Sequence, residues 1–198
     1  EALQASLGAP MFYRWFFPLL WLAFIAVWIA MARSGKAVAE RESVSSRLSH
    51  YLPLLIAIYL LAAPHVPIPA LNDRFAPLSL SLVRLGAALT LAGIAFAVWA
   101  RMLLAGNWSS DVTLKRDHEL VVDGPYSFVR HPIYTGILLA LAGTALAVGE
   151  WRAVLAVVIV ALAFWRKLRV EEAFMRRQFG ETYARYAARV PTLIPFVG

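Results

Sequence analysis

The sequence predicts an all-α integral membrane protein with about five transmembrane helices. Its 198 residues are 61% hydrophobic and only 16% charged, whereas soluble domains carry about 25% charged residues. Apolar runs long enough to cross the hydrocarbon core recur along the chain. Lys and Arg lie between and after these runs, which is the positive-inside pattern of membrane proteins and argues against a nucleic-acid partner.

The first two expected spans cover residues 15–31 and 51–63. Trp and Phe near the outer end of the first span are typical interface anchors, and Pro18 falls in its first turn, where proline is tolerated. The second span is short because a proline-rich piece that begins at Pro64 ends it.

The remaining expected spans cover residues 78–104, 132–148 and 151–165. Arg84 near the start of the third span can extend its charged end to the interface. So few residues, around Glu150, join the fourth and fifth spans that only a tight hairpin fits between them.

About five spans place the connecting segments alternately on two sides of the membrane. Residues 33–47, 106–130 and 166–198 then share one side, and the last of these segments carries seven Lys and Arg against three Glu. The side richest in Lys and Arg faces the cytosol. We therefore expect a multi-pass protein whose C-terminal segment is cytosolic and whose N-terminus is outside.

We expect one domain over residues 11–198, preceded by an added remnant at residues 1–10, because Met11 reads as a native start. From Ala173 to Ala188, apolar and aromatic residues recur among charged ones. That spacing is typical of an amphipathic helix lying on the membrane surface. Gly180 is expected to weaken this helix or split it in two.

A polar loop meets the fourth span at the stretch from Gly124 to Gly136. Pro132 suits the first turn of a helix, so a helix is expected to begin at His131 or Pro132. Tyr134 then lies near the same face as His131. Arg130, His131 and Tyr134 converge at the membrane–water boundary, beside backbone N–H groups that lack an intrahelical partner. Such a place can hold an anionic or polar cofactor.

Glu171 and Glu172 follow the fifth span and form a second candidate group. Paired carboxylates can receive ribose hydroxyls or an ammonium group. The alternative is that Arg169 and Arg176 simply neutralise them at a helix start, where acidic residues are favoured. His131 and Tyr134 also have plain alternatives, as a helix cap and as a member of an aromatic belt.

Several classes of site are excluded by the sequence. There is no cysteine, so a disulfide or a thiolate nucleophile is impossible. The His, Asp and Glu residues before the fourth span lack the spacing of zinc ligands, and we predict no metal site. Neither a Rossmann nor a P-loop motif occurs, and Ser127 has no G-x-S-x-G setting.

The second half of the chain resembles the isoprenylcysteine carboxyl methyltransferase family. The resemblance rests on several motifs that occur in one order: Gly124-Pro125-Tyr126, Arg130-His131-Pro132-x-Tyr134-x-Gly136, Glu171-Glu172, Phe179-Gly180-Glu181-x-Tyr183-x-x-Tyr186, and Arg189-Val190-Pro191-x-Leu193-x-Pro195-Phe196. It covers the chain from about Gly106 onward, while the first two spans match only in character.

The resemblance implies a membrane methyltransferase that uses S-adenosylmethionine. The segment that contains Arg130, His131, Pro132 and Tyr134, together with the paired glutamates, would enclose this cofactor on the cytosolic side, with the C-terminal segment closing the pocket. A lipophilic or prenylated acceptor would enter from the bilayer, among membrane lipids. A cationic side chain would orient an acceptor carboxylate, and the candidates are Arg169 and Arg189.

Three other functions stay open at this stage. Phospholipid N-methyltransferases look similar in the same region and use the same cofactor, but an amine acceptor needs a general base. Membrane sterol reductases share an R-H-P-x-Y-like segment and use NADPH, yet they show an aspartate-containing motif where this chain has Glu171-Glu172. A non-enzymatic membrane scaffold would leave these residues without a common pocket.

Overall fold

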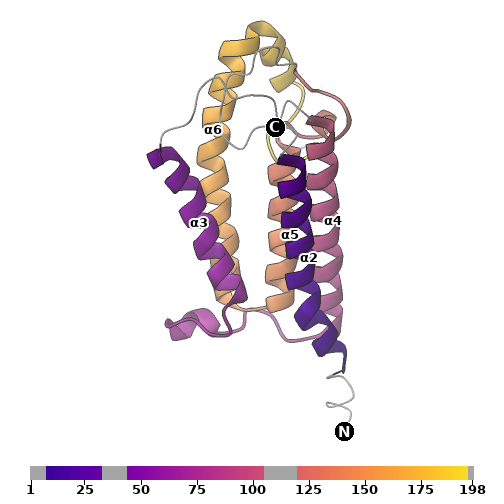
Figure 1. The fold of residues 1–198 in the computed structure, drawn as a ribbon, viewed down its shortest axis with the longest axis vertical. Coiled ribbons are helices and arrows are strands. Elements are labelled where there is room, and N and C mark those ends of the chain that lie inside the picture. Colours follow the sequence, from indigo (N-terminus) through magenta and orange to yellow (C-terminus); the bar gives the residue numbers. More distant parts are fainter. Residues whose placement is uncertain (1–7, 33–43, 105–119, 196–198) are drawn as a thin grey trace.

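The computed structural model describes residues 8–32, 44–104 and 120–195. It forms five long helices that run alternately up and down, with the N-terminus at one end and the C-terminus near the other (Figure 1). Their bounds are α2 Gly8–Ala32, α3 Val44–Ala62, α4 Leu80–Leu104, α5 Pro132–Val148 and α6 Trp151–Ala187. Two short 3₁₀ helices, η1 Pro69–Asn72 and η3 Gly124–Ser127, lie in the connections. The all-α prediction is confirmed for these residues.

By length and composition, α4 is the one described helix that qualifies as a clear membrane span. Three shorter apolar stretches occur in the other helices, at Trp15–Met31, Tyr51–Ala62 and Pro132–Val148. Each agrees closely with an expected span. The arrangement of about five crossings stays a prediction.

Some sequence-based expectations fall on residues outside the described ranges. They concern residues 1–7 of the expected remnant, residues 33–43 of the first basic loop, and residues 105–119 of the long polar loop.

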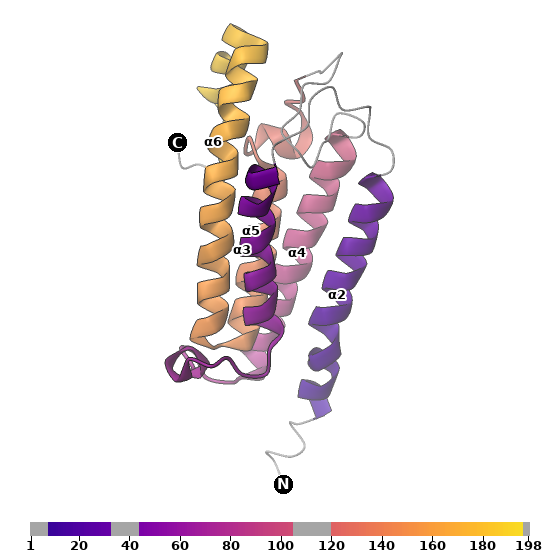
Figure 2. The same cartoon turned by 60° about the vertical axis from the view of Figure 1, so that its left-hand side comes forward.

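Helices α4 and α5 approach each other backbone to backbone, side by side in both views of the fold (Figures 1 and 2). Two pairs of glycines make this possible, Gly86 with Gly143 and Gly93 with Gly136. A Cβ atom at Gly93 would lie against the carbonyl oxygen of Gly136 and 2.5 Å from the nitrogen of Ala140. Small residues at such contacts are the usual device of membrane helix pairs, because lipid supplies no hydrophobic drive for association.

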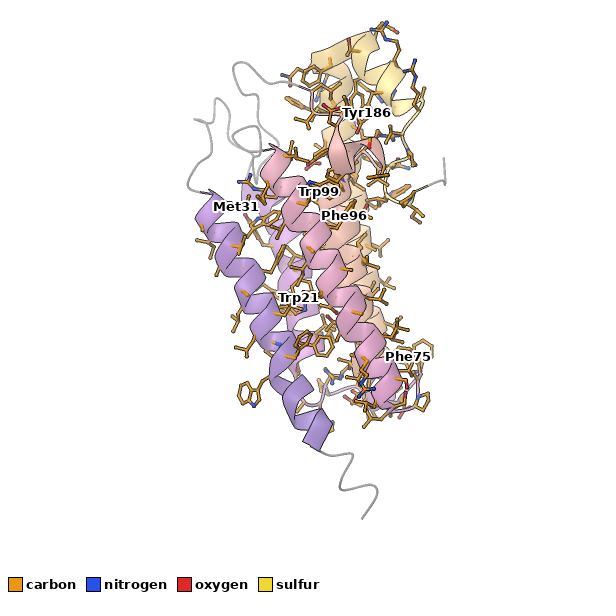
Figure 3. The ribbon with its side chains drawn as sticks, turned by 90° about the vertical axis from the view of Figure 1, so that its right-hand side faces the viewer. Trp21, Met31, Phe75, Phe96, Trp99 and Tyr186 are labelled. Carbon is orange, nitrogen blue, oxygen red and sulfur yellow. The ribbon has the colours of Figure 1, made fainter. Side chains whose placement is uncertain are left out.

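The other helices add their apolar faces to this pair. Helix α3 packs along α6 around Leu60, Val160 and Phe164. Helix α2 packs on α4 and α5 through Trp21 and Phe24. The Trp21 indole donates a hydrogen bond of 3.1 Å to the Thr144 hydroxyl on α5, and Figure 3 shows this indole partway along α2, between Met31 and the far end of the helix.

The end of the molecule away from the C-terminal segment is closed by the expected hairpin between α5 and α6. Helix α5 ends at Gly149, whose φ of 70° lies in the left-handed region. The Phe75 and Trp151 rings pack 5.7 Å apart in the same region, and Figure 3 shows Phe75 at the end opposite Tyr186.

Arg152 ties this hairpin to α3. Its side chain is buried, Nη1 donates 2.6 Å to the carbonyl of Leu60, and Nε donates 2.6 Å to Glu150 Oε2. The Leu60 carbonyl lies in the last turn of α3, where carbonyl groups have no intrahelical partner.

Replacing Arg152 by methionine is expected to lower the stability of the protein by ~3 kcal/mol. The change leaves the Leu60 carbonyl at the end of α3 without this donor and leaves Glu150 with the more distant Arg74, at 3.9 Å. The measurement is thermal unfolding in detergent. The control is Arg84→Met, which removes the same charge from an exposed position near the start of α4. Equal melting temperatures for the two variants would contradict this role of Arg152.

Helix α6 has different boundaries from the helices expected in the C-terminal part of the chain. The predicted fifth span ended at Trp165, and a separate surface helix was expected over Ala173–Ala188. Instead, the helix that begins at Trp151 continues through the charged residues as far as Gly180, whose φ of 50° and ψ of −126° are non-helical, and α6 resumes after this kink and ends at Ala187. The expectation that Gly180 splits the helical segment in two is confirmed. A charged sequence does not end a helix when no Gly or Pro stops it, so α6 projects beyond its apolar part and bends back only near its tip (Figure 1).

Candidate active site

The stretch from Gly124 to Gly136 folds as the sequence predicts. Helix α5 begins at Pro132 with His131 at its N-cap position, but the imidazole makes no capping hydrogen bond. The alternative in which the His131 side chain caps the helix is therefore wrong. The rings of His131 and Tyr134 stack 5.8 Å apart with an interplanar angle of 24°, so both side chains lie on the same face of the helix start.

The start of α5 meets the two glutamates of α6. The Tyr134 hydroxyl donates a 2.5 Å hydrogen bond to Glu171 Oε1. The His131 Nδ1 atom lies 3.5 Å from Glu171 Oε2, and its Nε2 atom lies 3.4 Å from Glu172 Oε1. Arg130 Nη2 lies 2.6 Å from the same Glu172 oxygen. The structure thus brings together residues that lie about forty positions apart in the chain.

This cluster is sheltered and not fully closed. The side chains are 10% exposed at His131, 18% at Glu172 and 24% at Glu171. Among the described residues, the buried His131 Nε2 has no hydrogen-bond partner, because its contact with Glu172 lacks hydrogen-bond geometry. A buried polar atom without a partner is costly, and this one is a candidate contact for a ligand.

The cluster also fixes the charge of its members. Burial alone would raise the pKa of both carboxyl groups, but the His131 ring outweighs it at Glu171, and His131 and Arg130 outweigh it at Glu172. The pKa of Glu172 falls to about 2. Burial would lower the pKa of His131, yet the neighbouring carboxylates of Glu171 and Glu172 raise it. The site therefore presents two carboxylates at neutral pH.

These shifts predict a stability optimum in mild acid. A lowered carboxyl pKa adds stability above its unfolded value near 4.5, and this is lost as the pH falls toward about 2. A raised histidine pKa adds stability that is complete below 6.5 and is lost as the pH rises through the folded value. For Glu172 the loss in acid is on the order of 1–2 kcal/mol, after allowance for solvent screening. Melting temperatures across pH 2–8 check this, and Glu172→Gln should flatten the acid limb; an unchanged acid limb would contradict it.

A C-terminal strap, defined here as residues 187–193, lies beside the start of α5. Three hydrogen bonds attach it: Arg130 N to Pro191 O at 2.8 Å, His131 N to Thr192 O at 3.1 Å, and Thr135 Oγ1 to Leu193 O at 2.7 Å. The first two use backbone N–H groups that precede the helix and would otherwise lack a partner. The strap is therefore fastened to the start of α5, next to the cluster.

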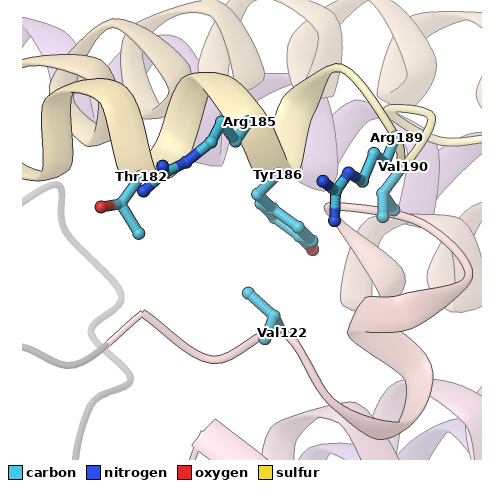
Figure 4. Close-up of a pocket in the computed structure, with 6 residues that line it drawn as sticks. All are labelled: Val122, Thr182, Arg185, Tyr186, Arg189 and Val190. Carbon is cyan, nitrogen blue, oxygen red and sulfur yellow. The ribbon is translucent and has the colours of Figure 1, made fainter.

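A shallow depression of about 390 Å³ lies between the end of α6 and the loop that carries Val122 (Figure 4). It is lined by Val122, Thr182, Arg185, Tyr186, Arg189 and Val190. The Tyr186 hydroxyl donates a 2.6 Å hydrogen bond to the carbonyl of Tyr126, which joins the end of α6 to η3.

The structure places the remaining predicted site residues in different surroundings. Pro132 is fully buried. Arg189 is exposed at the edge of the depression. Arg169 is exposed with its guanidinium 5.0 Å from the ring of Trp165, and no ion pair joins it to the glutamates within the described ranges.

The glutamates do not stand at a helix start, as the plain alternative required. They lie some twenty residues into α6, and their partners come from the start of α5 rather than from Arg169 or Arg176. That alternative is wrong.

Sequence reasoning missed two residues that complete the cluster. Thr192 accepts from Arg130 and Thr135 donates to the strap. The available signal was the Arg189-Val190-Pro191 motif, which marked the segment as important without indicating its partner.

Comparison with known proteins identifies the family of this chain. A family model described as Phospholipid methyltransferase matches residues 82–182. Protein-S-isoprenylcysteine O-methyltransferase B of Arabidopsis thaliana is 30% identical over 168 residues, which are 80% of this chain and 81% of the relative. Protein-S-isoprenylcysteine O-methyltransferase of Schizosaccharomyces pombe is 37% identical over 100 residues, which are 48% of this chain and 42% of the relative.

A solved structure shares the fold. It is the structure of the eukaryotic intramembrane Ras methyltransferase ICMT (isoprenylcysteine carboxyl methyltransferase). The two structures align with a TM-score of 0.55 and 23% sequence identity, over 77% of this chain and 52% of that one. The chain thus spans about half of that protein. Because the family model covers half of the sequence and the Arabidopsis relative matches over most of both lengths, the chain belongs to the isoprenylcysteine carboxyl methyltransferase family of integral membrane proteins.

Proposed function

We propose that this protein is a multi-pass membrane methyltransferase that transfers a methyl group from S-adenosylmethionine to a lipophilic acceptor, with a prenylcysteine-type carboxylate as the substrate class. The observation that supports it most directly is the meeting of His131 and Tyr134 with Glu171 and Glu172 at the start of α5. The names of its relatives support the acceptor.

The residues present fit this cofactor by their chemistry. S-adenosylmethionine carries an ammonium group, ribose hydroxyls and a sulfonium centre. Two carboxylates kept ionised by their surroundings suit the ammonium and hydroxyl groups. The unpartnered His131 Nε2 offers one further polar contact. The rings of Tyr134 and Phe164, 4.6 Å apart, supply an aromatic surface of the kind that attracts cations.

When bound, the cofactor supplies an electrophilic methyl group. Glu171 and Glu172 hold its polar parts, and Tyr134 keeps Glu171 oriented through its hydroxyl. A carboxylate acceptor is already ionised, so alignment and exclusion of water matter more than a strong base. Phe164 and the apolar face of Tyr134 exclude water on the side that faces the helices.

The acceptor reaches the site from the bilayer, because its prenyl chain is apolar and the cluster lies where α5 begins its apolar run. The basic C-terminal segment and the positive-inside bias favour a cytosolic active site. Arg169 and Arg189, both exposed cations on this side, remain the candidates that orient the carboxylate.

Phospholipid amines are the second candidate acceptor, since the matching family model bears that description. Purified protein in detergent with radiolabelled S-adenosylmethionine, offered a farnesylcysteine derivative or phosphatidylethanolamine, distinguishes the two. We expect label in a base-labile methyl ester of farnesylcysteine. Base-stable label in the phospholipid alone would indicate that the protein methylates phospholipid amines instead. Absence of label in both substrates would contradict the proposal.

A further inference from the structure

The side chain of Arg130 is fully committed to the protein. A guanidinium group has five N–H donors, and here it makes four hydrogen bonds and one further ion-pair contact. Nε donates a 2.8 Å hydrogen bond to Glu172 Oε1, and Nη2 lies 2.6 Å from the same oxygen. Nη2 also donates a 2.7 Å hydrogen bond to Thr192 Oγ1. Nη1 donates hydrogen bonds of 3.0 Å to Ala187 O and 2.5 Å to Val190 O. The side chain of this residue is only 10% exposed.

The acceptors come from parts of the chain that must be held together. Glu172 lies in the middle of α6, whereas Ala187 and Val190 belong to the end of that helix and the turn after it. The carbonyl groups there are ones that an ending helix leaves without a partner. The backbone of Arg130 adds a hydrogen bond to Pro191 O, so main chain and side chain of one residue hold the same strap.

The path of the strap depends on this attachment. Gly180 turns the chain at φ 50°, a conformation open mainly to glycine, and no atom lies within 4 Å of the position where its Cβ would be. The space beside Gly180 itself is therefore open. Residues 187–193 are held at the start of α5 by hydrogen bonds, and Arg130 makes the largest share of them. His131 N and the Thr135 hydroxyl add one hydrogen bond each.

We propose that Arg130 is a positioning residue, which fastens the C-terminal strap over the site and fixes Glu172 instead of donating to cofactor or acceptor. The proposal rests on the proposed function for the identity of the ligand and assigns one residue of that site. Lysine cannot replace Arg130, because a single ammonium group has three donors at one point and cannot span acceptors on two sides of a planar fork.

Trypsin offers a readout that requires no ligand. The chain contains Arg185 and Arg189 in or next to the strap, and Arg177 before the turn at Gly180. The side chains of the first two sites are already exposed, but cleavage also needs the backbone to open. A released strap frees that backbone, because proteases cut segments that open locally. Cleavage after Arg177 reports general unfolding within the same experiment.

The experiment compares wild type, Arg130→Lys, Thr192→Val and the double variant in detergent. We expect Arg130→Lys to speed cleavage after Arg185 and Arg189 about tenfold, with cleavage after Arg177 unchanged. The affinity for S-adenosylhomocysteine should fall in parallel. Thr192→Val should have a smaller effect, and the double variant should add little to Arg130→Lys, because both remove one network. Arg177→Lys is the matched control and should leave affinity unchanged.

Two results would overturn the proposal. The first is a loss of affinity, or a raised KM for the acceptor, with cleavage of the strap unchanged, since that is the behaviour of a direct ligand. The second is a released strap with affinity unchanged. If wild type itself bound no S-adenosylhomocysteine, the proposed function would fail, while the cleavage rates would still decide whether Arg130 fastens the strap.

Discussion

Replacing Gly93 by valine is expected to prevent α4 and α5 from pairing and to leave little folded protein in detergent. A Cβ at this position meets the backbone of α5 at Gly136 and Ala140, and backbone cannot move aside as a flexible side chain can. Separating the helices would also break the hydrogen bond of 3.2 Å between the Thr90 and Thr144 hydroxyls. The expected loss is ~3 kcal/mol or more, as for overpacking of a tight core.

The adjacent position supplies a matched control. Ala92 is exposed on α4, so Ala92→Val adds a similar volume to the same helix without touching α5. Size-exclusion profiles and melting temperatures in detergent compare the variants. A monodisperse Gly93→Val protein that melts with wild type would refute the close contact of these helices.

Replacing Glu171 by glutamine is expected to raise the KM for S-adenosylmethionine about 10- to 100-fold, because a hydrogen bond from a charged group contributes about 1.5–3 kcal/mol. The substitution keeps the shape of the side chain and its bond from Tyr134. It removes the charge that faces His131 and, in the proposed function, the cationic cofactor. Initial rates of methyl transfer over a range of cofactor concentrations give the KM.

Asp73→Asn is the control for this prediction. It removes one carboxylate from an exposed position in the connection before α4, at the opposite end of the molecule from the cluster. The KM for the cofactor should then equal that of wild type. If Glu171→Gln also left it unchanged, Glu171 would have no part in holding the cofactor.

The helices could be read from the sequence because their signals are local. Apolar runs marked the positions of the helices, and the proline at position 132 marked the start of α5. A two-residue connection left room only for the hairpin at Glu150. The length of α6 was predicted wrongly because the apolar run was taken as the helix. Helix formation continues through charged residues until a breaker such as Gly180 occurs.

The contact between His131 and Glu171, in contrast, could not be predicted from local sequence patterns. Nothing in the local pattern states which faces of α5 and α6 turn toward each other, so the residues alone left a helix cap and a neutralised helix start as alternatives. The resemblance to a family removed that choice by suggesting a shared pocket, and the distances agree with it.

Two features were present in the sequence and were not used. Glycines recur seven residues apart in both α4 and α5, at Gly86 and Gly93 and at Gly136 and Gly143, a spacing that places each pair on one face of its helix. Arg130 was assigned to the cofactor from its neighbourhood alone. The four acceptor atoms of its side chain include two strap carbonyls and a threonine hydroxyl that no sequence pattern identifies.

The central claim is that the cluster at the start of α5 holds S-adenosylmethionine. Titration calorimetry of the purified protein in detergent, with S-adenosylhomocysteine and NADPH as separate ligands, tests it most directly. We predict saturable binding of S-adenosylhomocysteine at one site per chain, weakened in His131→Ala, and no binding of NADPH. Binding of NADPH alone would contradict the claim and indicate a reductase.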